Sequence, residues 1–181
     1  AGDIATLAAF CDSWDTDNFD LLVENYRRQI RGLIDGGADL LVGETLLYPQ
    51  EAEAILTAAE LEGAGATMIT YSMQSGGFLY SGHDAGPLMG QLENWGAAAV
   101  GFNCVAADGM VPHLVSKLRR FTKLPLICKP NAGNPIINEK GQAEYKLEPE
   151  PFARIVKACY ENGASFLGGC CGTTPAHMAA L

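Results

Sequence analysis

The sequence lacks any apolar run near the length of about 18 to 20 residues that a membrane-spanning helix needs. No lysine or arginine precedes an apolar N-terminal stretch, as it would in a secretory signal peptide. Basic residues are scarce, because 12 Lys and Arg stand against 21 Asp and Glu and give a net charge of -9. These absences argue against a membrane span and a secretory signal. They also argue against nucleic acid or an anionic membrane as the main partner.

The composition is that of an ordinary folded protein, with 48% hydrophobic and 18% charged residues in a chain of 181. This length supports one domain with a sizeable core, and we assign residues 1–181 to it. The chain begins at Ala1 and stops where a last helix is predicted to start. We therefore expect a domain truncated at its N-terminus and in that helix.

Six cysteines are present: Cys11, Cys104, Cys128, Cys159, Cys170 and Cys171. An even count suggests disulfides in a small secreted protein, but this chain is longer and has other means of stability. We expect reduced thiols and a cytoplasmic location.

A weak repeat organises the chain. Gly-Ala followed by a short apolar run and then small or polar residues recurs from Gly37, Gly65, Gly96 and Gly163, and Leu-Pro replaces Gly-Ala at Leu124. The spacing is mostly about 30 residues, the length of one strand–helix unit. Each glycine is predicted to end a helix, and each apolar run to form a strand buried on both faces of a parallel sheet.

Helices are predicted over 16–37, 49–63 and 148–163, from their apolar periodicity, acidic or proline starts and glycine ends. In the first, Thr16 or Asp17 is the expected N-cap. Its predicted apolar face consists of Phe19, Leu22, Val23, Tyr26, Ile30, Leu33 and Ile34.

With residues 1–4 ("AGDI") counted as a truncated strand, the chain has six strand–helix units. An open doubly wound sheet would fit six units, whereas an eight-stranded barrel of about 250 residues would leave roughly two missing. Polar or thiol residues stand where the apolar runs stop: Glu44, Ser72, Asn103, Cys104, Asn131, Cys170 and Cys171. Barrel enzymes gather their chemistry at that rim, so we predict an α/β fold, an incomplete (β/α)8 TIM barrel covering about its last six units.

Three of the cysteines stand at predicted strand ends. Cys170 and Cys171 follow one strand and Cys104 lies two strands earlier, so the thiols can converge in a barrel. Three thiolates with one open position form a catalytic type of zinc site, and sulfur ligands favour zinc over magnesium or calcium. The alternatives are packing in buried strands or a strained vicinal disulfide. Cys11, Cys128 and Cys159 are interpreted as packing residues.

Four segments carry a resemblance to a known family: "GADLLVGET", "GFNC", "KPNAGNP" and "GGCCGTTPAHM", in this order. Together they resemble the homocysteine S-methyltransferase family, and most of all the homocysteine-binding module of cobalamin-dependent methionine synthases. The resemblance covers essentially the whole chain. The sequence lacks the first two strand–helix units of the family. In the family these units include an Asp-Gly segment that closes the barrel and helps hold the amino acid.

The resemblance implies zinc-dependent transfer of a methyl group to the thiol of homocysteine, which gives methionine. It implies one Zn²⁺ per chain held by Cys104, Cys170 and Cys171. Glu44 would receive the substrate's amino group, Asn131 would lie near the zinc and fill its open position without substrate, and Ser72 would line the pocket. The methyl donor stays open between methylcobalamin on another domain or subunit, S-methylmethionine and betaine.

Two other functions are compatible with the residues. A phosphate-ester-binding barrel enzyme would use the glycine-rich turns "PNAG" and "GGCCGTT" after the last two strands, but it leaves the cysteines unexplained. An inactive barrel fragment would expose two strand edges and keep a zinc site.

Overall fold

The structure is a computed structural model, and it describes residues 16–181. Its helices are α2 (Thr16–Asp35), α3 (Pro49–Leu61), α4 (Ala85–Asn94), α5 (Val111–Arg119), α6 (Pro149–Glu161) and α7 (Pro175–Ala179). Its strands are β1 (Leu40–Leu46), β2 (Ala66–Ser72), β3 (Ala99–Ala106), β4 (Leu126–Asn131), β5 (Ile136–Ile137), β6 (Ala143–Glu144) and β7 (Phe166–Leu167). The strand predicted over residues 1–4 lies outside the described residues.

A five-stranded parallel sheet forms the centre of the fold, in the order β1-β2-β3-β4-β7. Each of these strands pairs with the next one along the chain. A doubly wound sheet would reverse its strand order at a switch point, whereas a barrel wall runs in sequence order. The order therefore confirms an arc of a (β/α) barrel.

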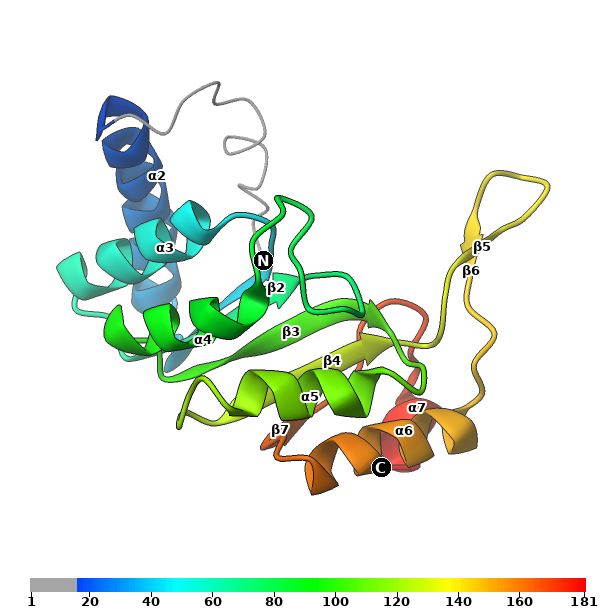
Figure 1. Ribbon diagram of the computed structural model, residues 1–181. Helices are drawn as coiled ribbons and strands as arrows, with labels where there is room; N and C mark the ends of the chain where they lie inside the picture. Colours follow the sequence, from blue (N-terminus) through cyan, green and yellow to red (C-terminus); the bar gives the residue numbers. More distant parts are fainter. Residues whose placement is uncertain (1–15) are drawn as a thin grey trace.

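Helices α3, α4, α5 and α6 lie against one face of this sheet (Figure 1). The fully buried side chains of Ile69, Tyr71, Phe102 and Cys128 belong to the core. Successive side chains of a strand point to opposite faces of the sheet. The face away from the helices is therefore the inner face of the barrel wall. Leu40 and Val42, on either side of buried Leu41, are about half exposed. The described arc thus has one covered and one open face.

The helices and strands predicted within residues 16–181 are confirmed, with three corrections. Not every strand is buried on both faces, because Leu40 and Val42 of β1 and Phe166 of β7 are exposed. Leu33 is 44% exposed and does not belong to the buried face of α2, which is formed by Leu22, Val23, Tyr26 and Ile30. Gly65 does not end α3. That position belongs to Gly63, whose φ is 64°, and this is the glycine at which the helix over 49–63 is predicted to end. At Gly37 and Gly96, by contrast, φ is 86° and 90°, as a left-handed helix end requires.

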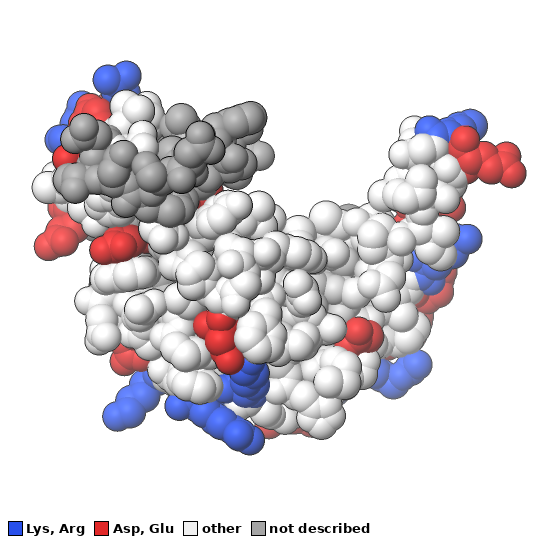
Figure 2. All heavy atoms as spheres, turned by 45° about the horizontal axis from the view of Figure 1, so that its top comes forward, with Lys and Arg blue, Asp and Glu red and all other residues white. Residues whose placement is uncertain are grey.

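A hairpin that the sequence did not reveal projects from the body. Strands β5 and β6 pair antiparallel between the end of β4 and the start of α6 (Figure 1). Figure 2 shows it standing clear of the body, with basic and acidic side chains at its tip. Ile136 and Ile137 on it are exposed. Among the described helices, none is long and apolar enough to cross a bilayer.

Candidate metal centre

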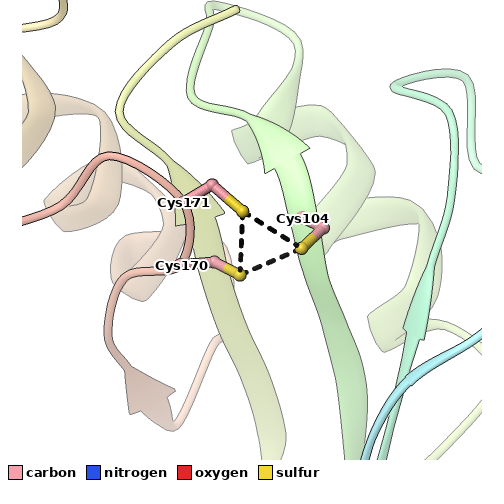
Figure 3. A group of neighbouring side chains, drawn as sticks. All are labelled: Cys104, Cys170 and Cys171. Atoms are coloured by element: carbon pink, nitrogen blue, oxygen red, sulfur yellow. Dashed lines mark hydrogen bonds between the residues drawn. The ribbon is translucent and has the colours of Figure 1, made fainter. Parts of the chain in front are cut away.

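Three thiols converge at the carboxyl edge of the sheet. Cys104 belongs to β3, and Cys170 and Cys171 lie in the loop between β7 and α7 (Figure 3). The Sγ atoms of Cys104 and Cys170 are 3.0 Å apart. Cys171 Sγ lies 3.8 Å from Cys104 Sγ and 3.9 Å from Cys170 Sγ. Within the described residues, this is the group of side chains whose ligand atoms are close enough to hold a metal ion.

The sulfur triangle has the dimensions of one face of a zinc tetrahedron. Zn–S bonds of about 2.3 Å in tetrahedral geometry place sulfur atoms about 3.8 Å apart. Two of the three separations meet this value, and Cys104 and Cys170 need to part by less than an ångström. Three cysteines also leave one coordination position open, so the residues fit a zinc ion of the catalytic type.

The loop that carries Cys170 and Cys171 is fastened to the end of β4. Cys170 N donates to Pro130 O (2.9 Å), and Ala132 N donates to Cys171 O (2.9 Å). Gly172 follows with φ of 77°, a conformation that only glycine adopts without strain. This backbone lets two consecutive residues direct their sulfur atoms toward Cys104.

Bulges interrupt β1 and β3 at the same edge of the sheet. The pairing register shifts between Gly43 and Leu46 in β1, and between Asn103 and Ala106 in β3. Inside the bulges, Thr45 and Cys104 have positive φ values of 65° and 58°. Such conformations cost non-glycine residues about 1 to 3 kcal/mol and occur mainly at functional sites. Here the β3 bulge directs the Cys104 thiol toward the loop after β7.

Asn103 connects the two bulges and the thiols. Its Nδ2 donates to Thr45 Oγ1 (2.6 Å) and lies 3.5 Å from Cys104 Sγ and 3.6 Å from Cys170 Sγ. Its Oδ1 accepts from Thr45 N (3.1 Å) and Thr70 Oγ1 (2.9 Å). The Asn103 side chain is fully buried. It therefore fixes the position of β3 against β1 and β2 directly beneath the sulfur atoms.

The thiols share protons unevenly. The hydrogen bond between Cys104 and Cys170 lowers the pKa of Cys170 to about 5, with further help from Asn103. The same bond, together with burial, raises the pKa of Cys104. One member of this pair is thus a thiolate at neutral pH, and thiolates are the form that binds metal.

Asn131 and Tyr145 lie next to Cys171. Asn131 is buried at the end of β4, and its Oδ1 accepts from Cys171 N (3.0 Å). Half-buried Tyr145 belongs to the segment between β6 and α6. Burial and then its hydrogen bond with Cys171 raise the pKa of the Tyr145 phenol. Asn131 was expected from the sequence to lie near the metal, whereas Tyr145 was missed because no pattern marks a loop tyrosine.

The two remaining predicted residues lie on neighbouring strands. Ser72 ends β2, is buried, and pairs in register with Asn103. Glu44 lies in β1 directly before Thr45, is exposed, and forms an ion pair with Lys129 of β4. Lys129 was not expected from the sequence as a site residue.

The other cysteines in the described residues belong to the core. Cys128 of β4 and Cys159 of α6 are fully buried. They form a hydrogen bond with each other, and this bond and burial raise the pKa of Cys128. Both are packing residues, as the sequence predicted. Cys11 lies outside the described residues.

These features define a class of protein: a (β/α) barrel with a three-cysteine candidate metal site at the carboxyl edge of its strands. The chain belongs to the homocysteine S-methyltransferase family, whose sequence profile matches residues 1–181.

Two relatives with named activities are similar to this chain in sequence. Methionine synthase of Mycobacterium tuberculosis is 31% identical over 159 residues, which are 84% of this chain and 13% of that protein. Homocysteine S-methyltransferase YbgG of Bacillus subtilis is 30% identical over 160 residues, 88% of this chain and 50% of that protein. The chain thus spans about half of YbgG and a small part of the methionine synthase.

Solved structures agree with the fold. The metallated form of the homocysteine methyltransferase MmuM from Escherichia coli superposes with a TM-score of 0.73 at 26% identity, over 100% of this chain and 58% of that one. Its apo form gives a TM-score of 0.72 at 27% identity, over 90% of this chain and 56% of that one.

Proposed function

We propose that this chain is the homocysteine-binding, zinc-holding part of an enzyme that transfers a methyl group to the thiol of homocysteine, giving methionine. The observation that supports it is the convergence of Cys104, Cys170 and Cys171 within 3.9 Å of one another in a member of this family. YbgG and MmuM carry the corresponding activity in their names.

The three cysteines would hold one Zn²⁺ and leave its fourth position facing the substrate. A thiol like that of homocysteine has a pKa of about 8.5, and a metal ion such as Zn²⁺ lowers it so that the sulfur is a thiolate at neutral pH. Three cysteine thiolates give the site a net charge near -1, so they keep a bound sulfur rich in electrons. Glu44 would bind the ammonium group of the amino acid, and Asn131 would take the open position without substrate.

The reaction exchanges one bond for another. The homocysteine sulfur attacks the methyl carbon, and the new S–C bond forms as the bond from methyl to donor breaks. The leaving group keeps the electron pair, and the thiol proton goes to solvent. We propose that the donor comes from outside the described chain, either as methylcobalamin on another domain or subunit or as a small onium compound such as S-methylmethionine or betaine.

The proposed metal site requires its three cysteines to be reduced thiols. Because reduced thiols persist in reducing compartments, we propose that the protein acts in the cytoplasm.

A donor panel tests this function. Zinc-loaded protein is incubated with homocysteine and with S-methylmethionine, betaine or methylcobalamin, and methionine is measured. We expect methionine with at least one donor and none from Cys170→Ala, whereas Cys128→Ala in the core keeps its activity. A polypeptide extended at the N-terminus is assayed in parallel.

Three results bear on the alternatives. Equal rates for the two lengths exclude the inactive-fragment hypothesis. Methionine formed at the same rate by Cys170→Ala contradicts the proposal. A protein that holds no metal and binds phosphate esters but no thiol would also contradict the proposal.

A further inference from the structure

An ion pair crosses the inner face of the sheet. Glu44 of β1 pairs with Lys129 of β4, although β2 and β3 lie between these strands. The side chains are 36% and 27% exposed, respectively, so both are accessible to a solute. The contact is not one between neighbouring strands, and it places one negative and one positive group side by side on the open face of the arc.

Both members of the pair are adjacent to residues that hold the thiols. Lys129 pairs in register with Asn103, whose Nδ2 reaches Cys104 and Cys170. Glu44 directly precedes Thr45, which exchanges two hydrogen bonds with Asn103. The chain that leads into the cysteine loop also passes over Lys129, since a Cβ at Gly168 would lie 3.2 Å from Lys129 Cγ.

An amino acid is chemically complementary to such a pair. Its ammonium and carboxylate are bonded to the same carbon, so one molecule can insert between a carboxylate and an ammonium and replace one ion pair with two. Partly exposed ion pairs contribute little to stability, so opening this one costs little. A thiol at the far end of the side chain would then be directed to the cysteines.

We propose that Lys129 is a substrate-binding residue that receives the α-carboxylate of homocysteine, while Glu44 receives the α-ammonium. The Glu44–Lys129 ion pair is the substrate-free state of this subsite. The inference rests on the proposed function, because it requires a zwitterionic thiol as the ligand.

The competing explanation is structural: the ion pair ties β1 to β4, and its loss would loosen the site for every ligand alike. Three thiols separate the explanations. Homocysteine carries both charged groups, homocysteamine lacks the carboxylate, and γ-mercaptobutyrate lacks the ammonium. Their dissociation constants are measured by calorimetric titration of the zinc-loaded protein and of the Lys129→Met, Lys129→Arg and Glu44→Gln variants.

We expect Lys129→Met to weaken homocysteine and γ-mercaptobutyrate by about tenfold to a hundredfold, the range for a lost charge-assisted hydrogen bond. Homocysteamine should bind no more weakly, because Glu44 is freed for its ammonium. Glu44→Gln should show the reverse pattern, with homocysteine and homocysteamine weakened and γ-mercaptobutyrate not. Lys129→Arg keeps the charge and should retain most of the affinity for homocysteine.

The inference is overturned if Lys129→Met weakens homocysteine and homocysteamine by the same factor, or changes neither. Zinc content and the melting temperature of each variant are measured alongside, so that a folding defect is recognised by a loss of zinc and of all three ligands. A wild-type zinc-loaded protein that binds none of the thiols instead contradicts the proposed function, and this inference fails with it.

Discussion

Asn103 and Thr45 are joined by two hydrogen bonds across the intervening strand β2: Asn103 Nδ2 donates to Thr45 Oγ1 (2.6 Å), and Thr45 N donates to Asn103 Oδ1 (3.1 Å). The bonds lock together the bulges of β1 and β3. One bulge contains the predicted amine ligand Glu44, and the other contains Cys104. The relative placement of the proposed substrate and metal subsites thus depends on a buried amide.

Asn103→Ala should therefore weaken zinc binding. Truncation leaves Thr45 and Thr70 without their partner and releases the Cys104 bulge, and loss of such a supporting residue typically lowers metal affinity about tenfold to a hundredfold. The affinity is measured by competition with a chromophoric chelator. Asn138→Ala, on the projecting hairpin, is the control and should bind zinc as the wild type does. Equal affinity in Asn103→Ala and wild type would contradict this role.

Gly172→Ala should disturb the site through its backbone and through a steric clash. Its φ is 77°, and an added Cβ would overlap Cβ and Cγ of Tyr145. Gly141 is a matched control, because its φ is 75° and an added Cβ meets no atom within 4 Å. Both variants should lose about 1 to 2 kcal/mol of unfolding free energy from the backbone strain.

The two glycine variants should differ in metal binding. We expect only Gly172→Ala to lose zinc affinity in addition, because the clash displaces the neighbouring Cys171. Urea titration and zinc competition measure the two effects separately. Equal zinc affinity in both variants would show that the loop tolerates the displacement.

Tyr71→Phe should leave the fold as stable as the wild type, or more stable by about 1 kcal/mol. Tyr71 is fully buried, and its hydroxyl has no hydrogen-bond partner among the described residues; the same burial raises the pKa of its phenol. Removing an unsatisfied buried hydroxyl removes its desolvation cost. Tyr80→Phe, at an exposed position, serves as the control for urea unfolding. A loss of 1 kcal/mol or more in Tyr71→Phe would mean that the hydroxyl makes a stabilising contact.

Metal removal should expose one reactive thiol. The pKa of Cys170 is lowered to about 5, so above that pH its thiolate form predominates, and the thiolate is the form that reacts with iodoacetamide. Cys104, whose pKa is raised, stays protonated and should react more slowly. Alkylation followed by peptide mass spectrometry should therefore label Cys170 first, at a rate nearly constant between pH 6 and 8.

Two controls accompany the alkylation. Added zinc should protect both thiols, and buried Cys159 should stay unlabelled in either state. A rate at Cys170 that rises tenfold per pH unit across this range would contradict the lowered pKa.

Much of the fold follows from local sequence. The Gly-Ala repeat predicts parallel strands at regular spacing, and parallel topology brings the ends of those strands to one edge. For this reason Cys104 and Cys170 could be expected to meet although they are 66 residues apart. The apolar pattern of α2 predicts its buried face except for Leu33, because apolar spacing marks the face of a helix but not which of its residues a neighbouring element covers.

Other features depend on contacts that no local pattern encodes. A threonine and a cysteine with positive φ are unfavourable by themselves, and they persist here because Asn103 and the surrounding sheet hold both bulges. The ion pair of Glu44 and Lys129 depends on the curvature of the sheet across two intervening strands. Its residues look like ordinary strand charges in the sequence.

The central claim is that the three cysteines hold a zinc ion whose open position takes the homocysteine sulfur. Zinc K-edge X-ray absorption of the zinc-loaded protein, recorded with and without homocysteine, tests it most directly. We predict three sulfur ligands and one lighter ligand without homocysteine, and four sulfur ligands with it. A sulfur count that does not change on addition of homocysteine would contradict the account.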